Sequence, residues 1–443
     1  MKYLYTFFLL SIFSISTGFT QSNPKNIIIV TVNGMGFNHA QALESFEGTE
    51  NIWKDFPTQY GVTTYPAYSN VITEDKDVHY YTGDYHNRRI WSDSAYVDNM
   101  ITDPASAGTA IATGVKSAYK SVGVDLDSTA LETILERAFT IGKSTGIITD
   151  LAIPQSGVAS FAAHVPSSDD TLGVLAGLLQ SQLSLIIGAG HPFYTNNGEA
   201  RDGDFSYFPL SIWQALDDGL TEYGTGISAI DITNDGIADP WSLIDASIEI
   251  DSMATRLLIV PEMFDAIQFK RNSTEPVDFV PELPELSIRG INHLNNDPDG
   301  FVLIVESGAV DYASRNNDAE ALITAMQTVQ ATVDSLSQWI ESNSSWDETM
   351  IVVTGTYETG FVTSPNFDAD QGSPEYYTQT VPIENGTVGE LPNILFQSEF
   401  PTRFATPLYA KGVGSDEFSN YIDQEDFVYG HIINNSEIGQ ACF

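Results

Sequence analysis

Short runs of aliphatic and β-branched residues recur along the chain, separated by stretches in which apolar residues recur at helical spacing. The first run covers residues 26–32 (NIIIVTV), and later runs cover residues 184–188, 257–260, 301–305 and 350–354. Helical spacing is found in residues 131–142 and 318–340. Because continuous apolar runs are typical of strands buried on both faces, the alternation predicts an α/β fold. Its doubly wound, mostly parallel central sheet is flanked by helices.

Polar and ionisable residues follow three of these predicted strands. Asn33 follows the first run; the other two runs are followed by Glu306, Asp311, Tyr312 and Arg315, and by Thr356, Tyr357 and Glu358. Ligand sites of open α/β sheets lie at the carboxyl ends of strands, so these side chains predict one shared site. Simpler interpretations stay open: Asn33 beside Gly34 is typical of a turn, and Glu306 and Asp311 also fit helix caps or solvated loop acids.

A segment of small residues, Thr102 to Ser117, has the sequence of a helix start. It reads TDPASAGTAIATGVKS, with an acid, a proline and then small residues up to a glycine. A helix N-terminus collects free N–H groups and partial positive charge, which suits an anion or a nucleophile. Asp103 is therefore a candidate substrate-binding residue. Its neighbour Pro104 has no hydroxyl, but proline is well tolerated at the first helical position, so we expect the turn to keep its shape.

The first residues have the composition of a secretory signal. In residues 1–20, Lys2 precedes an apolar stretch from Leu4 to Ile15, which is short for a membrane span. We expect a secreted or periplasmic protein with no membrane contact after cleavage; an uncleaved anchor is the alternative. Residues 21–443 are expected to form a single α/β domain, with an insertion around residues 190–250, where Gly, Asp, Asn and Tyr are frequent.

The chain is strongly acidic. It has 59 Asp and Glu against 18 Lys and Arg, a formal net charge of −41. Such a surface repels nucleic-acid phosphates and anionic lipid, so both are poor candidates as partners. The simplest interpretation is adaptation to salty surroundings, where charge is screened. Cys442 is the only cysteine, which excludes an intrachain disulfide and a cysteine-based structural metal site.

One local group of cations and aromatic residues differs from this acidic background. Residues 79–91 read HYYTGDYHNRRIW and contribute the candidate substrate-binding residues His79, His86, Arg88, Arg89 and Trp91. Bidentate arginine contacts and aromatic stacking suit an anionic or sugar-like ligand. A surface loop that balances nearby acids is the alternative.

Four blocks of the sequence, in this order, resemble the alkaline phosphatase family. Residues 26–36 resemble its first strand and Asp-Gly-Met-Gly turn, and residues 102–117 resemble its Thr-Asp-Ser-Ala segment and the Ala-Thr-Gly-Val-Lys that follows. Residues 301–318 resemble its Glu-Gly-Gly-x-x-Asp-His block, and residues 350–360 its Val-Val-Thr-Ala-Asp-His-Glu-Thr-Gly block. The blocks span nearly the whole chain after the predicted signal and imply the fold of that family.

The resemblance also implies a site with a serine nucleophile, two zinc ions and a magnesium ion, and this chain departs from it at most positions. The metal-bridging aspartate corresponds to Asn33, the serine to Pro104 and a zinc-binding histidine to Arg315. The Asp-His pair of the last block corresponds to Thr356 and Tyr357. Further metal or phosphate ligands correspond to Gln155, Gly157, Ser168 and Pro401, whereas the kept acids are Glu306, Asp311 and Glu358.

These substitutions predict that the two-zinc site is absent and that no cofactor is needed. Two carboxylates without a histidine do not hold two zinc ions tightly, and the fixed charge of Arg315 disfavours a dication nearby. An alternative is one magnesium or calcium ion at Glu306, Asp311 and Asn33, with residual phosphatase or sulfatase activity.

The sequence therefore predicts an alkaline-phosphatase-like protein that has lost zinc-dependent phosphomonoester hydrolysis and keeps the fold for binding or for a repurposed, metal-independent reaction. The catalytic alternative is a polysaccharide lyase, or a glycosidase with a carboxylate pair, acting on anionic polysaccharide. Its candidate catalytic residues are Tyr357, Tyr312, Arg315 and Asn33. In both cases the expected partner is an anionic carbohydrate or another small anionic ligand.

Overall fold

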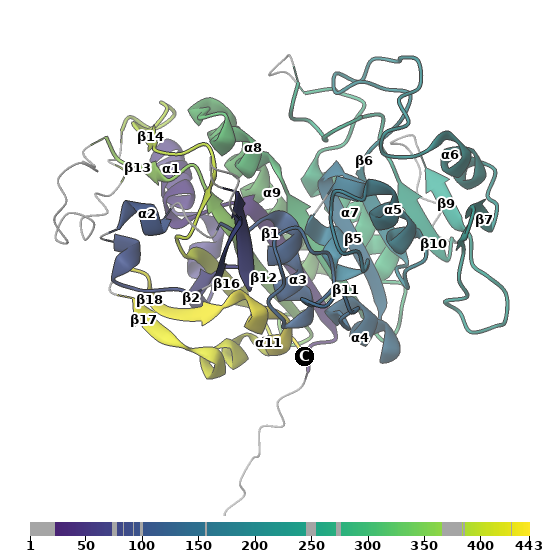
Figure 1. Cartoon of the computed structure of the whole chain (residues 1–443), viewed down its shortest axis with the longest axis horizontal. Helices are drawn as coiled ribbons and strands as arrows, with labels where there is room; N and C mark the ends of the chain where they lie inside the picture. The colour runs from purple at the N-terminus through teal and green to yellow at the C-terminus, as the bar shows by residue number, and fades with distance from the viewer. Residues whose placement is uncertain are drawn as a thin grey trace, which may run out of the picture.

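A computed structural model describes residues 23–72, 78–82, 84–91, 93–97, 101–155, 157–244, 254–271, 276–365, 383, 386–426 and 428–443 (Figure 1). The predicted signal, residues 1–20, lies outside these ranges.

A central sheet runs through the molecule and joins twelve strands among the described residues. Its order is β17-β18-β2-β16-β12-β1-β11-β5-β6-β10-β9, and β15 pairs with β12. From β12 to β9 all neighbours are parallel, whereas β16 is antiparallel to β12 and β2. The predicted mostly parallel sheet is confirmed. Its strands are β1 (Asn26–Gly34), β2 (Thr58–Thr63), β5 (Ser144–Ala152), β6 (Leu185–Ala189), β9 (Trp241–Ile244), β10 (Arg256–Ile259), β11 (Phe301–Ser307), β12 (Thr349–Thr359), β15 (Pro401–Thr402), β16 (Thr406–Lys411), β17 (Gln424–Asp426) and β18 (Gly430–Asn434).

Two apolar cores lie on opposite faces of this sheet. The pleat sends Ile27 and Ile29 of β1 into one core and Ile28 and Val30 into the other. The first core contains residues of α3 (Pro104–Thr113), α4 (Ile134–Thr140), α5 (Thr171–Leu179), α6 (Leu210–Asp217) and α11 (Ile438–Ala441). The second contains residues of α1 (Phe37–Glu47), α7 (Leu283–Leu294), α8 (Ala309–Arg315) and α9 (Ala319–Asn343). The helices thus cover both faces, as a doubly wound fold requires (Figure 1).

Three strands extend further than their apolar runs predict. β12 continues to Thr359, so Thr356, Tyr357 and Glu358 belong to the strand and do not follow it. β1 and β11 likewise include Asn33 and Glu306. Four of these polar side chains hydrogen-bond to neighbouring strands, and this keeps the backbone in the sheet where the hydrophobic pattern ends: Asn33, Glu306, Thr356 and Glu358.

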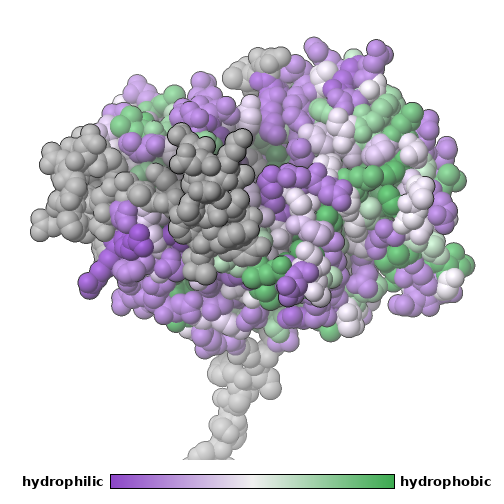
Figure 2. All heavy atoms as spheres, in the orientation of Figure 1, coloured by the Kyte–Doolittle hydropathy of each residue, from purple (hydrophilic) through white to green (hydrophobic). Residues whose placement is uncertain are grey.

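The remaining elements lie outside the central sheet. They are α2 (Ser94–Val97) and the strand pairs β3 (Tyr68–Ile72) with β4 (Val78–Thr82), β7 (Glu222–Gly224) with β8 (Ile227–Ser228), and β13 (Val362–Thr363) with β14 (Leu395–Phe396). Within the described ranges, no helix is long and apolar enough to cross a membrane. The face in Figure 2 is mostly hydrophilic, with hydrophobic residues in scattered groups.

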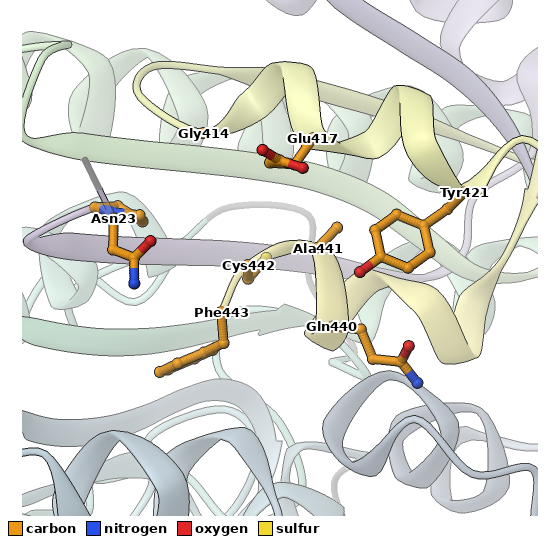
Figure 3. A pocket seen from close by; sticks show the side chains of 9 residues that line it. Asn23, Gly414, Glu417, Tyr421, Gln440, Ala441, Cys442 and Phe443 are labelled. Atoms are coloured by element: carbon orange, nitrogen blue, oxygen red, sulfur yellow. The ribbon is translucent and has the colours of Figure 1, made fainter. Parts of the chain in front are cut away.

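The C-terminal residues border a pocket of about 260 Å³ (Figure 3). Glu417 and Tyr421 lie on one side of it, and Cys442 and Phe443 come from the end of the chain. Cys442 is buried, and burial raises the pKa of its thiol to about 12. It is therefore a packed, protonated side chain at neutral pH.

Candidate functional site

Glu306 is the centre of a buried hydrogen-bond network at the carboxyl edge of the sheet. It is 1% exposed. Its Oε1 accepts from Asn33 Nδ2 at 3.0 Å and from the Gly157 N–H at 2.8 Å, and its Oε2 accepts from Thr149 Oγ1 at 2.7 Å. Burial raises the pKa of Glu306, and these hydrogen bonds oppose the rise. All three donors are neutral, so they solvate the carboxylate without cancelling its charge.

Asn33 connects Glu306 to the next strand. Its Nδ2 donates to Glu306 of β11, and its Oδ1 accepts from Thr356 Oγ1 of β12 at 2.6 Å. Because β1 lies between β11 and β12, the hydrogen bonds run across three neighbouring strands. The backbone turns here as the Asn-Gly pair indicates, because the Met35 N–H donates to the Val32 carbonyl at 3.4 Å and Gly34 has a φ of 87°. The Asn33 residue is nevertheless only 1% exposed, so its side chain belongs to the buried network.

Asp311 is held by a cation and a hydroxyl. Arg315 Nε lies 2.7 Å from Asp311 Oδ2, and Thr359 Oγ1 donates to Oδ1 at 2.6 Å. Burial lowers the pKa of Arg315, but attraction to Asp311 and the proximity of Tyr357 outweigh it, so the net pKa is raised. Asp311 and Arg315 side chains are 16% and 37% exposed, which places the pair at the edge of the buried region.

Tyr357 lies beneath this ion pair. The residue is 0% exposed, and its hydroxyl makes no hydrogen bond to another described residue. Burial and then the charge of Asp311 raise its pKa well above the usual value, and Arg315 opposes the rise. Tyr357 is therefore a neutral phenol at physiological pH.

The start of α3 keeps the shape that the sequence predicts. Asp103 is the N-cap, and its carboxylate accepts from the backbone N–H groups of Ala105 and Ser106, while Pro104 occupies the first turn. Asp103 Oδ1 also accepts from Ser106 Oγ at 2.5 Å and from the Lys120 N–H at 2.9 Å. The free N–H groups that suit an anion are thus partly taken by the carboxylate of the chain itself.

Gly157 lies between Pro104 and Glu306. A Cβ at this position would lie 2.6 Å from Glu306 Oε1 and 3.2 Å from Pro104 Cβ. Because real Cβ atoms do not approach so closely, the packing of α3 against Glu306 requires glycine here.

The two faces of α8 separate two of the predicted catalytic residues. Asp311 and Arg315 bond to each other, and Ser314 Oγ lies 3.1 Å from His39 Nε2. Tyr312, the residue next to Asp311 in the helix, packs against Phe269 instead, with ring centroids 5.8 Å apart. Asn33, Arg315 and Tyr357 are therefore grouped near the acids of the strand ends, whereas Tyr312 contacts a different part of the chain.

The group of cations and aromatic residues is used largely for internal contacts. Trp91 is 2% exposed, and its Nε1 donates to Asp426 Oδ2 at 3.0 Å. Arg89 pairs with Asp93 at 2.8 Å and covers the ring of Tyr96. Two further candidates, His86 and Arg88, are exposed. The backbone of His79 lies in β4, but its side chain is outside the described part of the structure.

Glu358 is a buried acid with neutral donors. It accepts from Thr402 Oγ1 and, at 3.4 Å, from the Val362 N–H. Burial raises its pKa to about 7. Close by, a Cβ at Gly36 would lie 2.5 Å from Glu358 Cγ, so Glu358 packs against the turn that follows β1.

Two further positions from the family pattern have local partners. Gln155 Oε1 accepts from Tyr207 OH at 3.2 Å, so it contacts the segment around residues 190–250 that was expected to be an insertion. The Ser168 N–H donates to the Lys120 carbonyl at 2.8 Å.

Sequence reasoning missed Thr149, Asp150 and Thr359. Asp150 is 2% exposed, accepts from Ser307 Oγ at 3.0 Å and from the Gly308 N–H at 2.6 Å, and has a pKa raised by burial to about 7. Thr149 and Asp150 follow the apolar residues Ile147 and Ile148 of β5, so the same strand-end signal that selected Glu306 could have found them.

Across the described ranges, no group of three or more His, Cys, Asp or Glu side chains is arranged to hold a metal ion. The sequence model of the family described as "Alkaline phosphatase" matches residues 24–172 and 255–397, more than half of the chain. The chain belongs to the alkaline phosphatase family.

Relatives and solved structures of alkaline phosphatases agree with this membership. Alkaline phosphatase 4 of Bacillus subtilis is 23% identical over 76% of this chain, and the repressible alkaline phosphatase of Saccharomyces cerevisiae is 22% identical over 81%. The matches span 62% and 59% of those relatives' own lengths. The alkaline phosphatase of the Antarctic bacterium TAB5 superimposes with a TM-score of 0.62 at 17% identity, over 95% of this chain and 97% of that one.

The alkaline phosphatase of Thermus thermophilus also has a TM-score of 0.62, at 16% identity over 98% of this chain and 94% of that one. At these identities the structures show a shared fold and nothing finer. Residues 173–254, which include the whole of the expected insertion around residues 190–250, lie between the two stretches that match the family.

Proposed function

We propose that this member of the alkaline phosphatase family does not hydrolyse phosphomonoesters with metal ions, and that its strand-end site binds a small anionic ligand through Arg315. The observation that carries the proposal is the ion pair between Arg315 Nε and Asp311 Oδ2 at 2.7 Å. A guanidinium bound to a carboxylate supplies the positive charge that a metal ion supplies in a metallo-site.

The donor set at the strand ends fits a metal ion poorly. Zinc prefers imidazole, thiolate and carboxylate ligands in a closed geometry, whereas Glu306 is surrounded here by an amide, a hydroxyl and a backbone N–H. Those three donors occupy three of the about four lone-pair positions of the carboxylate, which leaves at most one for a cation. The fixed charge of Arg315 adds repulsion toward any dication near Asp311.

The position of the expected nucleophile supports the same proposal. Pro104 has neither a hydroxyl nor a free N–H, and the carboxylate of Asp103 caps the first turn. Ser106, the hydroxyl residue that follows in the helix, is 2% exposed and hydrogen-bonds to Asp103 and Thr102. An incoming phosphate would therefore meet a bound carboxylate and no attacking group.

The accessible part of the Arg315 guanidinium favours binding of an anion. A guanidinium has five N–H donors, and Nε–H is the one that meets Asp311. The Arg315 side chain is 37% exposed, so part of its guanidinium is reachable from solvent. Arg315 and Lys120 both lower the pKa of Tyr119 against the larger effect of burial, so two cations contribute positive potential near that hydroxyl.

Elimination on a polysaccharide is less well supported. A lyase base must reach a ring proton of a polymer, at hydrogen-bond distance. Tyr357 and Asn33 are 0% and 1% exposed, and the raised pKa of Tyr357 keeps it protonated. The buried position of both side chains thus favours binding over this chemistry.

Two measurements test the proposal. First, the purified full chain is assayed on a chromogenic phosphomonoester with added zinc and magnesium, and turnover at the background rate is expected. Second, inorganic phosphate, sulfate and glucuronate are titrated calorimetrically into the wild type and into Arg315→Gln, where binding is expected to fall at least about tenfold.

Arg289→Gln is the matched control for the second measurement, because Arg289 also pairs with an acid four residues earlier, Glu285, at 2.6 Å. Metal-stimulated turnover, or anion binding that Arg315→Gln leaves unchanged, would contradict the proposal.

A further inference from the structure

A cavity of about 540 Å³ lies across α8 from the strand-end site. It is bounded by α8, by the first turns of α9 and by residues 267–271, with Leu283 at the start of α7. The volume falls in the usual range for small-molecule sites. Four residues of α8 line it at helical spacing, and they form the face opposite Asp311 and Arg315: Ala309, Tyr312, Ala313 and Asn316.

Aromatic rings and a lysine form one wall. The centroids of Phe269 and Tyr312 are 5.8 Å apart, and the rings are tilted by 53°. Lys270 Nζ lies 5.9 Å from the ring centroid of Phe269 and 5.7 Å from that of Tyr312. Tyr312 is 38% exposed. Its ring therefore keeps accessible apolar surface at the mouth of the cavity, beside a cation.

Hydrogen-bonding side chains form the opposite wall. The first turns of α9 contribute Asp318, Glu320, Thr324 and Thr328, next to Asn316 from the end of α8. The Thr324 and Thr328 hydroxyls donate to helix carbonyls, and Asn316 Nδ2 donates to the Tyr312 carbonyl. The oxygens of these side chains and the carboxylates of Asp318 and Glu320 remain as acceptors. A wall of acceptors favours a guest with several hydroxyl donors.

The charges around the cavity nearly balance. The cations Lys270 and Arg271 line the cavity together with the acids Glu282, Asp318 and Glu320, and Glu282 acts electrostatically on Arg271. Arg271 Nη1 donates to Gln268 Oε1 at 2.5 Å, which holds its guanidinium against the wall. At the base, Asp150 is bonded to Ser307 and Gly308. A guest of high charge of either sign would be repelled by the lining groups that carry its own sign, whereas a neutral guest would meet no such repulsion.

We infer that this cavity binds the end of a neutral carbohydrate chain, with a sugar ring stacked on Tyr312 and its hydroxyls bonded to the α9 wall. A sugar ring combines apolar C–H faces with a rim of hydroxyl donors and acceptors, which matches an aromatic wall facing a polar one. The cavity and the strand-end site share α8 but use different residues of it, since neither Asp311 nor Arg315 lines the cavity. The inference therefore does not depend on anion binding at Arg315.

The test uses the full chain on an array of neutral and acidic glycans, followed by calorimetry with the soluble oligosaccharide that binds best. Wild type is expected to bind at least one neutral glycan. Tyr312→Ala is expected to weaken that binding at least about tenfold, whereas Tyr312→Phe, which keeps the ring, stays within about twofold. Phe400→Ala removes another exposed aromatic ring, 61% exposed, and is expected to change nothing.

Three results would overturn the inference. One is the absence of binding to any neutral glycan of the array. The second is binding that Tyr312→Ala and Phe400→Ala affect equally. The third is binding limited to acidic glycans and abolished by Arg315→Gln, which would assign the carbohydrate to the strand-end site. Circular dichroism of each variant verifies that the fold is kept.

Discussion

Glu306 and Asp311 lie five residues apart, yet the chain stabilises them in opposite ways. Glu306 is fully buried and accepts from an amide, a hydroxyl and a backbone N–H. Asp311 is nearer the surface and is paired with the guanidinium of Arg315. In the first case neutral dipoles solvate the acid, and in the second a fixed charge neutralises it.

The difference shows two ways in which a protein can keep a carboxylate at the carboxyl edge of a sheet. A buried carboxylate needs hydrogen-bond donors for its oxygens. Neutral donors are sufficient for Glu306, although they do not fully offset the effect of burial, so its pKa stays raised. A carboxylate at the edge of the buried region can pair with a flexible cationic side chain from its own helix. We therefore expect the two acids to respond differently to substitution, pH and salt.

The largest effect is expected from Asn33→Asp. It places a second carboxylate beside Glu306, where Asn33 Nδ2 now donates at 3.0 Å, and like charges in a buried site repel strongly. The loss should be about 3–5 kcal/mol of unfolding free energy in mildly alkaline buffer, measured by urea denaturation. Asn33→Leu, which adds no charge, should lose less, about 1–3 kcal/mol. Equal losses would show that charge at Glu306 is unimportant.

The pH dependence of stability should follow from another buried acid with neutral donors, Glu358. The pKa of Glu358 is raised to about 7 by burial, so the native state keeps this proton at pH values where the unfolded chain has lost it. Its contribution is complete below the unfolded pKa of about 4.3 and disappears as the pH rises through about 7, a loss of up to about 3 kcal/mol. Glu358→Gln should flatten the curve of denaturation midpoint against pH; an unchanged curve would exclude this assignment.

Arg315→Met should have a smaller effect. It leaves Asp311 with Thr359 as its remaining side-chain donor, but the acid is partly exposed, so water replaces some of the lost interaction. The expected loss is about 1–2 kcal/mol. It should shrink at high salt, because screening weakens the pair in the wild type. Denaturation in low and high salt checks this, and a salt-independent loss would indicate a packing effect.

Pro104→Ser should change little. Serine and proline are both acceptable in the first turn of a helix, and the cap by Asp103 stays in place. A change below about 1 kcal/mol is expected, and phosphomonoester turnover should stay at background with zinc and magnesium present. Turnover restored by this single change would show that the nucleophile was the one missing part.

The smallest effect is expected at the exposed counterpart of the Arg315 pair. Arg89 and Asp93 are also four residues apart and lie 2.8 Å from each other, but their side chains are 51% and 36% exposed. Arg89→Met should leave the denaturation midpoint unchanged, because solvent screens such pairs. A loss of stability equal to that of Arg315→Met would show that burial does not explain the difference between the two ion pairs.

Much of the fold follows from the sequence because buried parallel strands are nearly all apolar. The runs at residues 26–32 and 301–305 identify β1 and β11 and the edge where the acids gather. The strand ends are less predictable, since hydrogen bonds such as Thr356 to Asn33 connect residues 323 positions apart. Local patterns also do not reveal that the two faces of α8 place Tyr312 and Arg315 in separate environments.

The aromatic and cationic group illustrates the same limit. Its composition suits a ligand, but Trp91 is buried beside Phe404 and bonded to Asp426, more than 300 residues later in the chain. Whether an indole faces solvent or a core depends on such distant partners. The individual roles predicted for the site residues remain predictions, and the variants above address them.

The network that joins Thr356, Asn33 and Glu306 has a consequence for how substitutions combine. Each hydrogen bond uses an atom that the next residue presents, so a change at one member leaves a buried polar group of another without its partner. Asn33→Asp, for example, replaces the donor to Glu306 with a second carboxylate. The three positions are therefore energetically coupled, and two substitutions within the network should not cost the sum of the single ones.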